Sequence, residues 1–170
     1  TLPSRGLGDV YKRQALLSFD NQKNNDALKF FESSKLLIQS HDNFLQEYIF
    51  SLLLDGQVKK AINQLKYSNN SIGGDFFEGN LLLILDSLNK KKFKQAALKL
   101  QKLEKFKEED SYKFIIYSTL KSYIDLFIYK KSDIVEQFGK LDLINMAFQN
   151  CYLNSKKTEP YFLKLINDPQ

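Results

Sequence analysis

The sequence predicts an all-α protein built from helical hairpins that repeat along the chain. Two stretches carry this prediction, FLQEYIFSLLLDGQVKKAINQLKYS from Phe44 and EGNLLLILDSLNKKKFKQAALKLQKL from Glu78. Each has an apolar helix, a short polar break, and a second helix with an alanine three residues after its apolar start. Ala27, Ala61 and Ala96 occupy this position and lie 34 and 35 residues apart. That period is typical of stacked helical hairpins.

Apolar residues at helical spacing define the elements in order. A first helix is expected to end at about Phe19. The partner and following helices are then expected at 26–38, 44–54, 58–67, 76–88, 93–106 and 111–129. Gly56 favours a turn between the second pair, because glycine tolerates the left-handed conformation at a helix end. The breaker-rich loop SNNSIGGD, 68–75, predicts a boundary between repeats.

After Tyr129 the repeat pattern weakens. A partner helix is expected to start at 134–138, although Glu136 stands near the position of the alanine. A last, degenerate pair is expected at 143–153 and 160–166, where Pro160 suits a first helical turn. The predicted repeat domain therefore covers 15–166, and 167–170 are a short polar tail.

The first 14 residues predict a segment of foreign origin. Residues 9–14, DVYKRQ, are what one reading frame of a transposase mosaic-end sequencing adapter encodes, and both arginines of the chain, Arg5 and Arg13, lie in 1–14. We therefore interpret Thr1 to Gln14 as a translated adapter, expected to be disordered or irregular. Without its three cations and one anion, the net charge falls from +5 to +3. The natural start of the chain, and any leader or anchor it carries, would then be missing.

Small and large side chains alternate on the second helices. The alanines allow two antiparallel helices to approach closely, and a large apolar residue four positions later fills the space to the next hairpin. The predicted repeat-packing residues are Ala27, Phe31, Ala61, Leu65, Ala96 and Leu100. Because one hairpin cannot bury both of its faces, roughly three or more are needed for a stable stack.

These features resemble the tetratricopeptide repeat family, and most closely its alphaproteobacterial members with hairpins like YIFSLLLDGQVKKAI. The family's first-helix glycine is absent, since Ile49 and Ile84 stand in its place. The resemblance implies a right-handed α-α superhelix of about four to five hairpins, with the first and last incomplete. It also implies a non-catalytic scaffold that holds a peptide or a partner helix in a concave groove lined by the first helix of each pair.

In that register the candidate partner groove is mostly apolar. It consists of Gln46, Phe50, Leu53, Leu54, Glu78, Leu81, Leu82, Leu85, Lys121 and Asp125. An apolar groove favours an amphipathic helix or an extended chain as occupant. The alternative is that leucines such as Leu81, Leu82 and Leu85 pack between repeats.

No pattern of catalytic, cofactor-binding or metal-ligating residues is found. His41 is the only histidine and has the pattern of a solvated turn residue, while Cys151 has that of a small core residue. The acids 108–110 fit a helix start. Gly73-Gly74 lacks the spaced glycines and lysine of a phosphate loop. We therefore expect no enzyme activity, cofactor or metal.

Three further expectations concern partners and location. Eight lysines between Lys90 and Lys107 would allow non-specific binding of a polyanion, but they also fit a solvated helix face, so no nucleic acid is expected. No apolar run reaches the roughly 18 residues of a membrane span. The composition fits a soluble bacterial protein of the cytoplasm or the periplasm, with oligomeric state undefined. A second functional interpretation is a regulatory or accessory domain of a larger enzyme or envelope assembly.

Overall fold

The computed structural model describes residues 5–20, 23–34, 43–68 and 75–167. Within these ranges all regular structure is helical, and no strand is present. The predicted all-α class is therefore confirmed, while the right-handed superhelix stays a prediction. The chain divides into two compact units, Thr1–Leu83 and Ile84–Gln170, where the sequence suggests one domain over 15–166.

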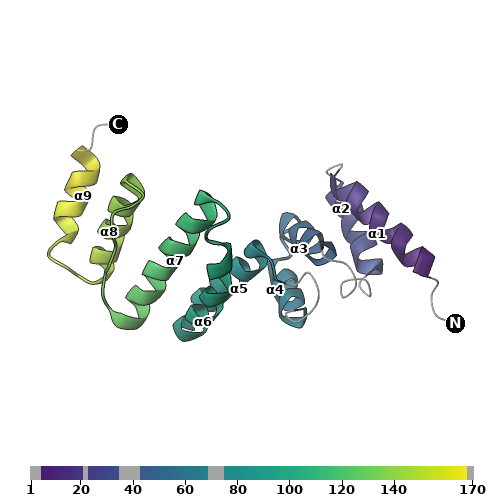
Figure 1. The fold of residues 1–170 in the computed structure, drawn as a ribbon, viewed down its shortest axis with the longest axis horizontal. Helices are drawn as coiled ribbons and strands as arrows, with labels where there is room; N and C mark the ends of the chain where they lie inside the picture. Colours follow the sequence, from purple (N-terminus) through teal and green to yellow (C-terminus); the bar gives the residue numbers. More distant parts are fainter. Residues whose placement is uncertain (1–4, 21–22, 35–42, 69–74, 168–170) are drawn as a thin grey trace. The chain divides into compact units, whose positions relative to one another are not determined.

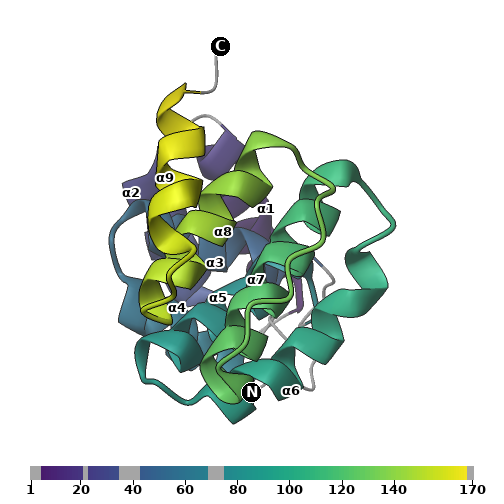
Figure 2. The ribbon, with the colours of Figure 1, turned by 90° about the vertical axis from the view of Figure 1, so that its left-hand side faces the viewer.

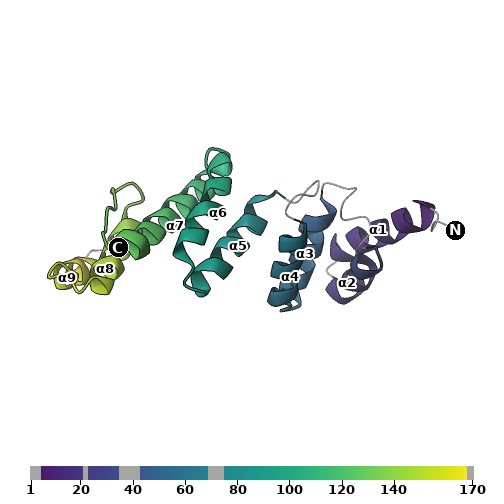
Figure 3. The same cartoon turned by 90° about the horizontal axis from the view of Figure 1, so that it is seen from below.

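The helices of unit 1 (Thr1–Leu83) form neighbouring pairs (Figures 1 and 3). They are α1 (Arg5–Asp20), α2 (Asn24–Ser33), α3 (Phe44–Leu54), α4 (Val58–Tyr67) and the first part of α5 (Phe77–Asn89). The bounds of α3 and α4 are those expected from the apolar periodicity. The predicted extension of α2 over 35–38 lies outside the described residues.

The helices of unit 2 (Ile84–Gln170) follow the predicted order with one exception. After the end of α5 come α6 (Phe93–Leu103), the short 3-10 helix η2 (Glu104–Phe106), α7 (Ser111–Tyr129), α8 (Lys140–Tyr152) and α9 (Thr158–Asn167). Residues 131–138, which were expected to start a helix, contain none. Figure 2 shows this stretch running back alongside α7 as an extended segment.

The expectation that 1–14 is disordered or irregular is wrong for residues 5–14, which belong to α1. Two contacts with α2 explain why a helix persists there. The ring of Tyr11 stacks on that of Phe30 with centroids 6.3 Å apart, and Ala15 is completely buried. Burial of an amphipathic face stabilises a helix whatever the origin of its sequence. The adapter origin itself stays a prediction.

The same turn closes three of the described hairpins. After α3, the N–H of Gly56 donates to Leu53 O and the N–H of Gln57 donates to Leu52 O, with Gly56 at φ +74°. This pair of bonds is the Schellman arrangement, which needs a left-handed residue. Lys91 after α5 and Asn154 after α8 occupy the equivalent left-handed position, at φ 56° and 52°. The turn therefore repeats where the sequence pattern is degenerate.

The end of α7 lacks this arrangement. Lys130 is also left-handed, but its N–H donates to Leu126 O in a single bond. The chain then leaves α7 through polar residues and the β-branched pair Ile134-Val135, which favours an extended backbone. No alanine follows at the position where a second helix would need a small residue. These differences account for the missing partner helix.

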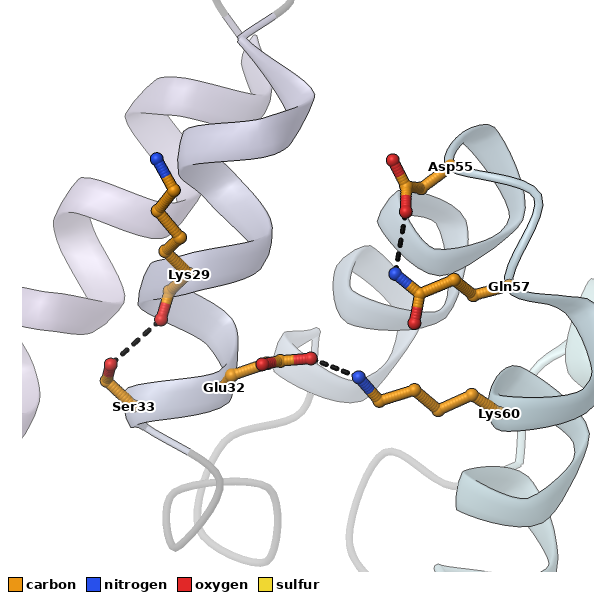
Figure 4. Close-up of polar contacts among 6 residues, drawn as sticks. All are labelled: Lys29, Glu32, Ser33, Asp55, Gln57 and Lys60. Carbon is orange, nitrogen blue, oxygen red and sulfur yellow. Dashed lines mark hydrogen bonds and ion pairs between the residues drawn. The ribbon is translucent and has the colours of Figure 1, made fainter.

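Unit 1 is held by one apolar cluster. The ring of Phe31 lies 5.1 Å from that of Phe44, edge to face, and 5.7 Å from that of Tyr48. Ala27 and Ala61 are completely buried, as the packing argument requires. On the surface, Lys60 of α4 pairs with Glu32 of α2, so an ion pair also joins neighbouring hairpins (Figure 4). An exposed pair of this kind adds at most about 1 kcal/mol, so the cluster carries the stability.

Unit 2 combines apolar packing with a buried polar layer. Ala96, Leu103, Ile124, Leu126 and Ala147 are among its fully or almost fully buried residues. The α8 helix also buries the polar side chains of Asp142, Asn145, Gln149 and Asn150. Buried polar groups are costly unless they are hydrogen-bonded. Their partners define the site described next.

Candidate functional site

A cleft of about 450 Å³ opens within unit 2, between α7, the extended segment 131–138 and the start of α8. Ligand sites in proteins commonly have volumes of about 300–1,000 Å³. Aromatic, hydroxyl, amide and charged side chains all contribute to its wall. They include Phe114, Tyr117, Ser118, Lys121, Ser122, Asp125, Asp133, Phe138, Asp142 and Asn145.

One face of α7 supplies the floor of this cleft. The floor residues are spaced by three or four positions, which places side chains on the same side of a helix. Phe114 and Tyr117 stand near the start of the helix, and Ser118, Ser122 and Asp125 continue toward its end. The small hydroxyl residues leave room above the helix that a second helix of a regular hairpin would occupy.

The extended segment is fixed to both helices that flank it. At one end the ring of Phe138 packs edge to face on that of Phe114, with centroids 5.5 Å apart. Near the other end, Ser132 Oγ donates to Gln149 Oε1 over 2.9 Å. Gln149 Nε2 in turn donates to Ser122 Oγ on α7 over 2.6 Å. Gln149 is completely buried, so this bridge is shielded from competing water.

Asp142 holds the junction between the segment and α8. Its carboxylate accepts hydrogen bonds from the backbone N–H groups of Gln137 and Phe138. These donors precede the helix and would otherwise be unsatisfied. Asp142 therefore has a structural role and is not free to bind a ligand through the same lone pairs.

Three charged side chains lining the cleft have no ion pair or hydrogen bond with any described residue: Lys121, Asp125 and Asp133. Lys121 and Asp125 are one turn apart, but a cation that precedes its anion at this spacing is the less favourable order in a helix. Lys107, by contrast, pairs with Glu104 at 3.1 Å, and that hydrogen bond raises the pKa of the Lys107 ammonium.

Two tyrosines near the cleft have raised phenol pKa values. Burial is the main cause for Tyr117, and the charges of Glu104 and Asp125 act in the same direction, while Lys107 lowers its pKa. Burial raises the pKa of Tyr123, whose hydroxyl donates to Asn145 Oδ1 over 3.2 Å. Both phenols therefore remain neutral hydrogen-bonding groups at physiological pH.

The predicted groove residues are not gathered in one described site. Seven lie in unit 1: Gln46, Phe50, Leu53 and Leu54 on α3, and Glu78, Leu81 and Leu82 on α5. Leu53 and Leu82 pack against the unit 1 core, and the ring of Phe50 contacts that of Phe76. Leu54 and Leu85 are exposed by 71% and 46%. Lys121 and Asp125 line the cleft of unit 2.

The residues considered for chemistry have other surroundings. Asp110 caps α7 by accepting from Lys113 N over 2.7 Å, and Glu109 pairs with Lys113. Cys151 is exposed on α8, although the sequence suggested a core position. His41 and Gly73-Gly74 lie outside the described residues. Among the side chains that are described, no group of three or more potential metal ligands occurs.

Sequence reasoning found only part of this cleft. Lys121 and Asp125 were predicted on the correct face of α7, but the opposite wall was missed because a helix was expected there. A usable signal was present: α8 carries Asp142, Asn145, Gln149 and Asn150 at spacings that bury polar groups. Such a pattern on a buried helix indicates a neighbour that needs hydrogen-bonding partners.

No protein-family model, curated protein or solved structure matches this chain. Among the described helices, none has both the length and the apolar character required to cross a membrane.

Proposed function

We propose that this chain is a non-catalytic protein-interaction module that binds a peptide segment of a partner. The observation that carries the proposal is the cleft on α7, which combines aromatic walls with charged groups that have no partner among the described residues. Pockets with apolar walls and a few polar groups bind and orient ligands. The position of the cleft also supports a peptide ligand, because it occupies the side of α7 against which a second helix would pack.

The recurring hairpins support the same class of function. Ala27, Ala61 and Ala96 are each completely buried, and the same turn follows α3, α5 and α8. Stacked hairpins present extended surfaces that are widely used for binding other proteins. A tetratricopeptide-type scaffold remains the architecture that we propose.

The test is a selection of peptides from a random library on the full chain, followed by affinity measurements. Ser118 lines the cleft, so Ser118→Trp should fill it and weaken binding of the selected peptides at least tenfold. Ser111→Trp makes the same change at an exposed position of the same helix and serves as the control. Circular dichroism checks that both variants keep their helices. Failure to select any peptide, or equal binding by both variants, would contradict the proposal.

A further inference from the structure

We propose that the cleft of unit 2 anchors the peptide through a basic side chain, an arginine or a lysine, held between Asp125 and Asp133. This inference rests on the proposed function and specifies the chemistry of its partner. Both carboxylates line the cleft, and neither has a hydrogen bond or an ion pair with a described residue. The argument has three steps: their relative level, the charge balance, and the aromatic wall.

The segment and α7 run in opposite directions, which brings the two carboxylates to the same end of the cleft. Phe138 contacts Phe114. From there, the five residues back to Asp133 span about 16 Å in an extended chain. The eleven residues of helix from Phe114 to Asp125 span about 16 Å as well. Asp133 therefore lies level with Asp125 to within about one helical turn.

The Gln149 bridge gives the same register independently. Gln149 joins Ser132 on the segment to Ser122 on α7. Asp133 is the next residue after Ser132, and Asp125 is one turn beyond Ser122. Two unrelated contacts, an aromatic pair at one end and a hydrogen-bonded bridge at the other, thus place the carboxylates near each other.

The charges at this end of the cleft favour a cation. Two carboxylates at one level repel each other unless a positive group lies between them. Lys121 also lines the cleft, but it is exposed and forms no ion pair with Asp125, so its ammonium is free to stay in water. The other lysine of the wall, Lys107, is already paired with Glu104 near the start of α7. The carboxylates at the far end therefore lack a built-in counter-ion among the described residues.

The aromatic wall suits the rest of a basic side chain. Tyr117, Phe114 and Phe138 line the same cleft, and long basic side chains pack their methylene groups on such surfaces. Guanidinium and ammonium groups are also attracted to aromatic faces. Arginine is favoured over lysine because its planar group can bond two carboxylates at once.

The selection described above tests this inference when it is repeated with the double variant Asp125→Asn, Asp133→Asn. Peptides selected by the unaltered chain should be enriched in arginine or lysine, and those selected by the double variant should not. The control variant Glu108→Gln, Glu159→Gln removes the same charge from exposed positions outside the cleft and should keep the enrichment.

A defined pair of probes gives the magnitude. The full chain should bind acetyl-Thr-Val-Arg-Val-Thr-amide about tenfold more tightly than the same peptide with glutamine in place of arginine. The double variant should bind the two probes equally, within about twofold, because it lacks the carboxylates. Raising the salt concentration should reduce the preference of the unaltered chain.

The outcomes separate this inference from the proposed function. Peptides that lose binding in Ser118→Trp but show no basic enrichment would leave the interaction module standing and overturn the cation anchor. An arginine preference that persists in the double variant would also overturn it. Equal binding of selected peptides to Ser118→Trp and Ser111→Trp would overturn both proposals.

Discussion

The two units solve the same packing problem in different ways. In unit 1 the second helices close each hairpin, and the interior is an apolar cluster centred on Phe31, Phe44 and Tyr48. In unit 2 an extended segment replaces the helix that should pair with α7, and α8 buries polar side chains that hydrogen-bond to it. An extended chain without a sheet needs side-chain partners for its polar groups. The comparison teaches that the irregular unit gains a cleft where the regular unit has a closed core.

The largest expected effect is loss of the central ring of unit 1. Phe31→Ala should lower the free energy of unfolding by about 3–5 kcal/mol, because it removes a completely buried ring and leaves a cavity. Leu54→Ala removes an exposed side chain and should change stability by less than about 0.5 kcal/mol. Urea denaturation measures both. Similar losses in the two variants would mean that the unit 1 cluster does not dominate its stability.

A second prediction concerns the close helix contact at Ala61. Ala61→Leu should destabilise by about 1–3 kcal/mol, because the added atoms cannot fit at a completely buried position. Asn63→Leu adds a leucine to the exposed side of α4 and is the matched control. Thermal denaturation compares the two. An unchanged melting temperature for Ala61→Leu would count against hairpin packing through alanine.

The polar bridge of unit 2 should behave differently from an apolar core residue. Gln149→Leu keeps the buried volume but leaves the hydroxyls of Ser122 and Ser132 without this partner, which should cost about 1–3 kcal/mol. Hydrogen exchange should accelerate most at residues 131–138, because the segment loses one of its attachments. Gln101→Leu, at an exposed position of α6, is the control. Unchanged exchange in the segment would refute the role of the bridge.

The smallest effect near neutral pH is expected for the one polar atom in the aromatic cluster of unit 1. Burial, and to a lesser degree the charge of Glu32, raise the pKa of Tyr48 to about 12. Its hydroxyl has no hydrogen-bond partner among the described residues. Tyr48→Phe should therefore leave stability at pH 7 unchanged or raise it by about 1 kcal/mol.

Alkaline pH should reveal Tyr48 more strongly. Below pH 10 the folded and unfolded chains both keep the phenol proton, so Tyr48 adds no pH dependence. Between about pH 10 and 12 the unfolded chain loses the proton while the folded chain retains it, so stability falls as the pH rises, by up to about 2–3 kcal/mol. Tyr48→Phe should remove this loss, and Tyr67→Phe, at a position that is 90% exposed, should not. Equal alkaline slopes in the two variants would contradict the buried phenol.

Periodicity was sufficient for most of the helices. The bounds of α3, α4 and α7 follow directly from apolar spacing and caps, because local sequence decides where a helix can start and stop. It was insufficient where neighbours override local preference. Residues 5–14 are helical because α2 covers them, and 134–138 are extended because α7 and α8 provide their partners.

Close approaches were equally invisible in the sequence. A Cβ added to Gly79 would lie 2.7 Å from Phe76 Cζ and 3.0 Å from Leu65 Cδ2. Nothing in the local pattern of α5 shows that this glycine is needed for space. The candidate site has the same character, since Asp133 and Asp125 are eight residues apart and meet only because the segment folds back along α7.

The sequence by itself determined the helical class, the positions of the main hairpins and the alanines at their contacts, because each depends on residues within a few turns of one another. The tertiary structure alone decided that α7 lacks a second helix and that a cleft with two carboxylates takes its place. The physical reason is that an extended segment has no hydrogen bonds of its own. Its course is therefore fixed by distant partners such as Gln149 and Asp142, which no local pattern can reveal.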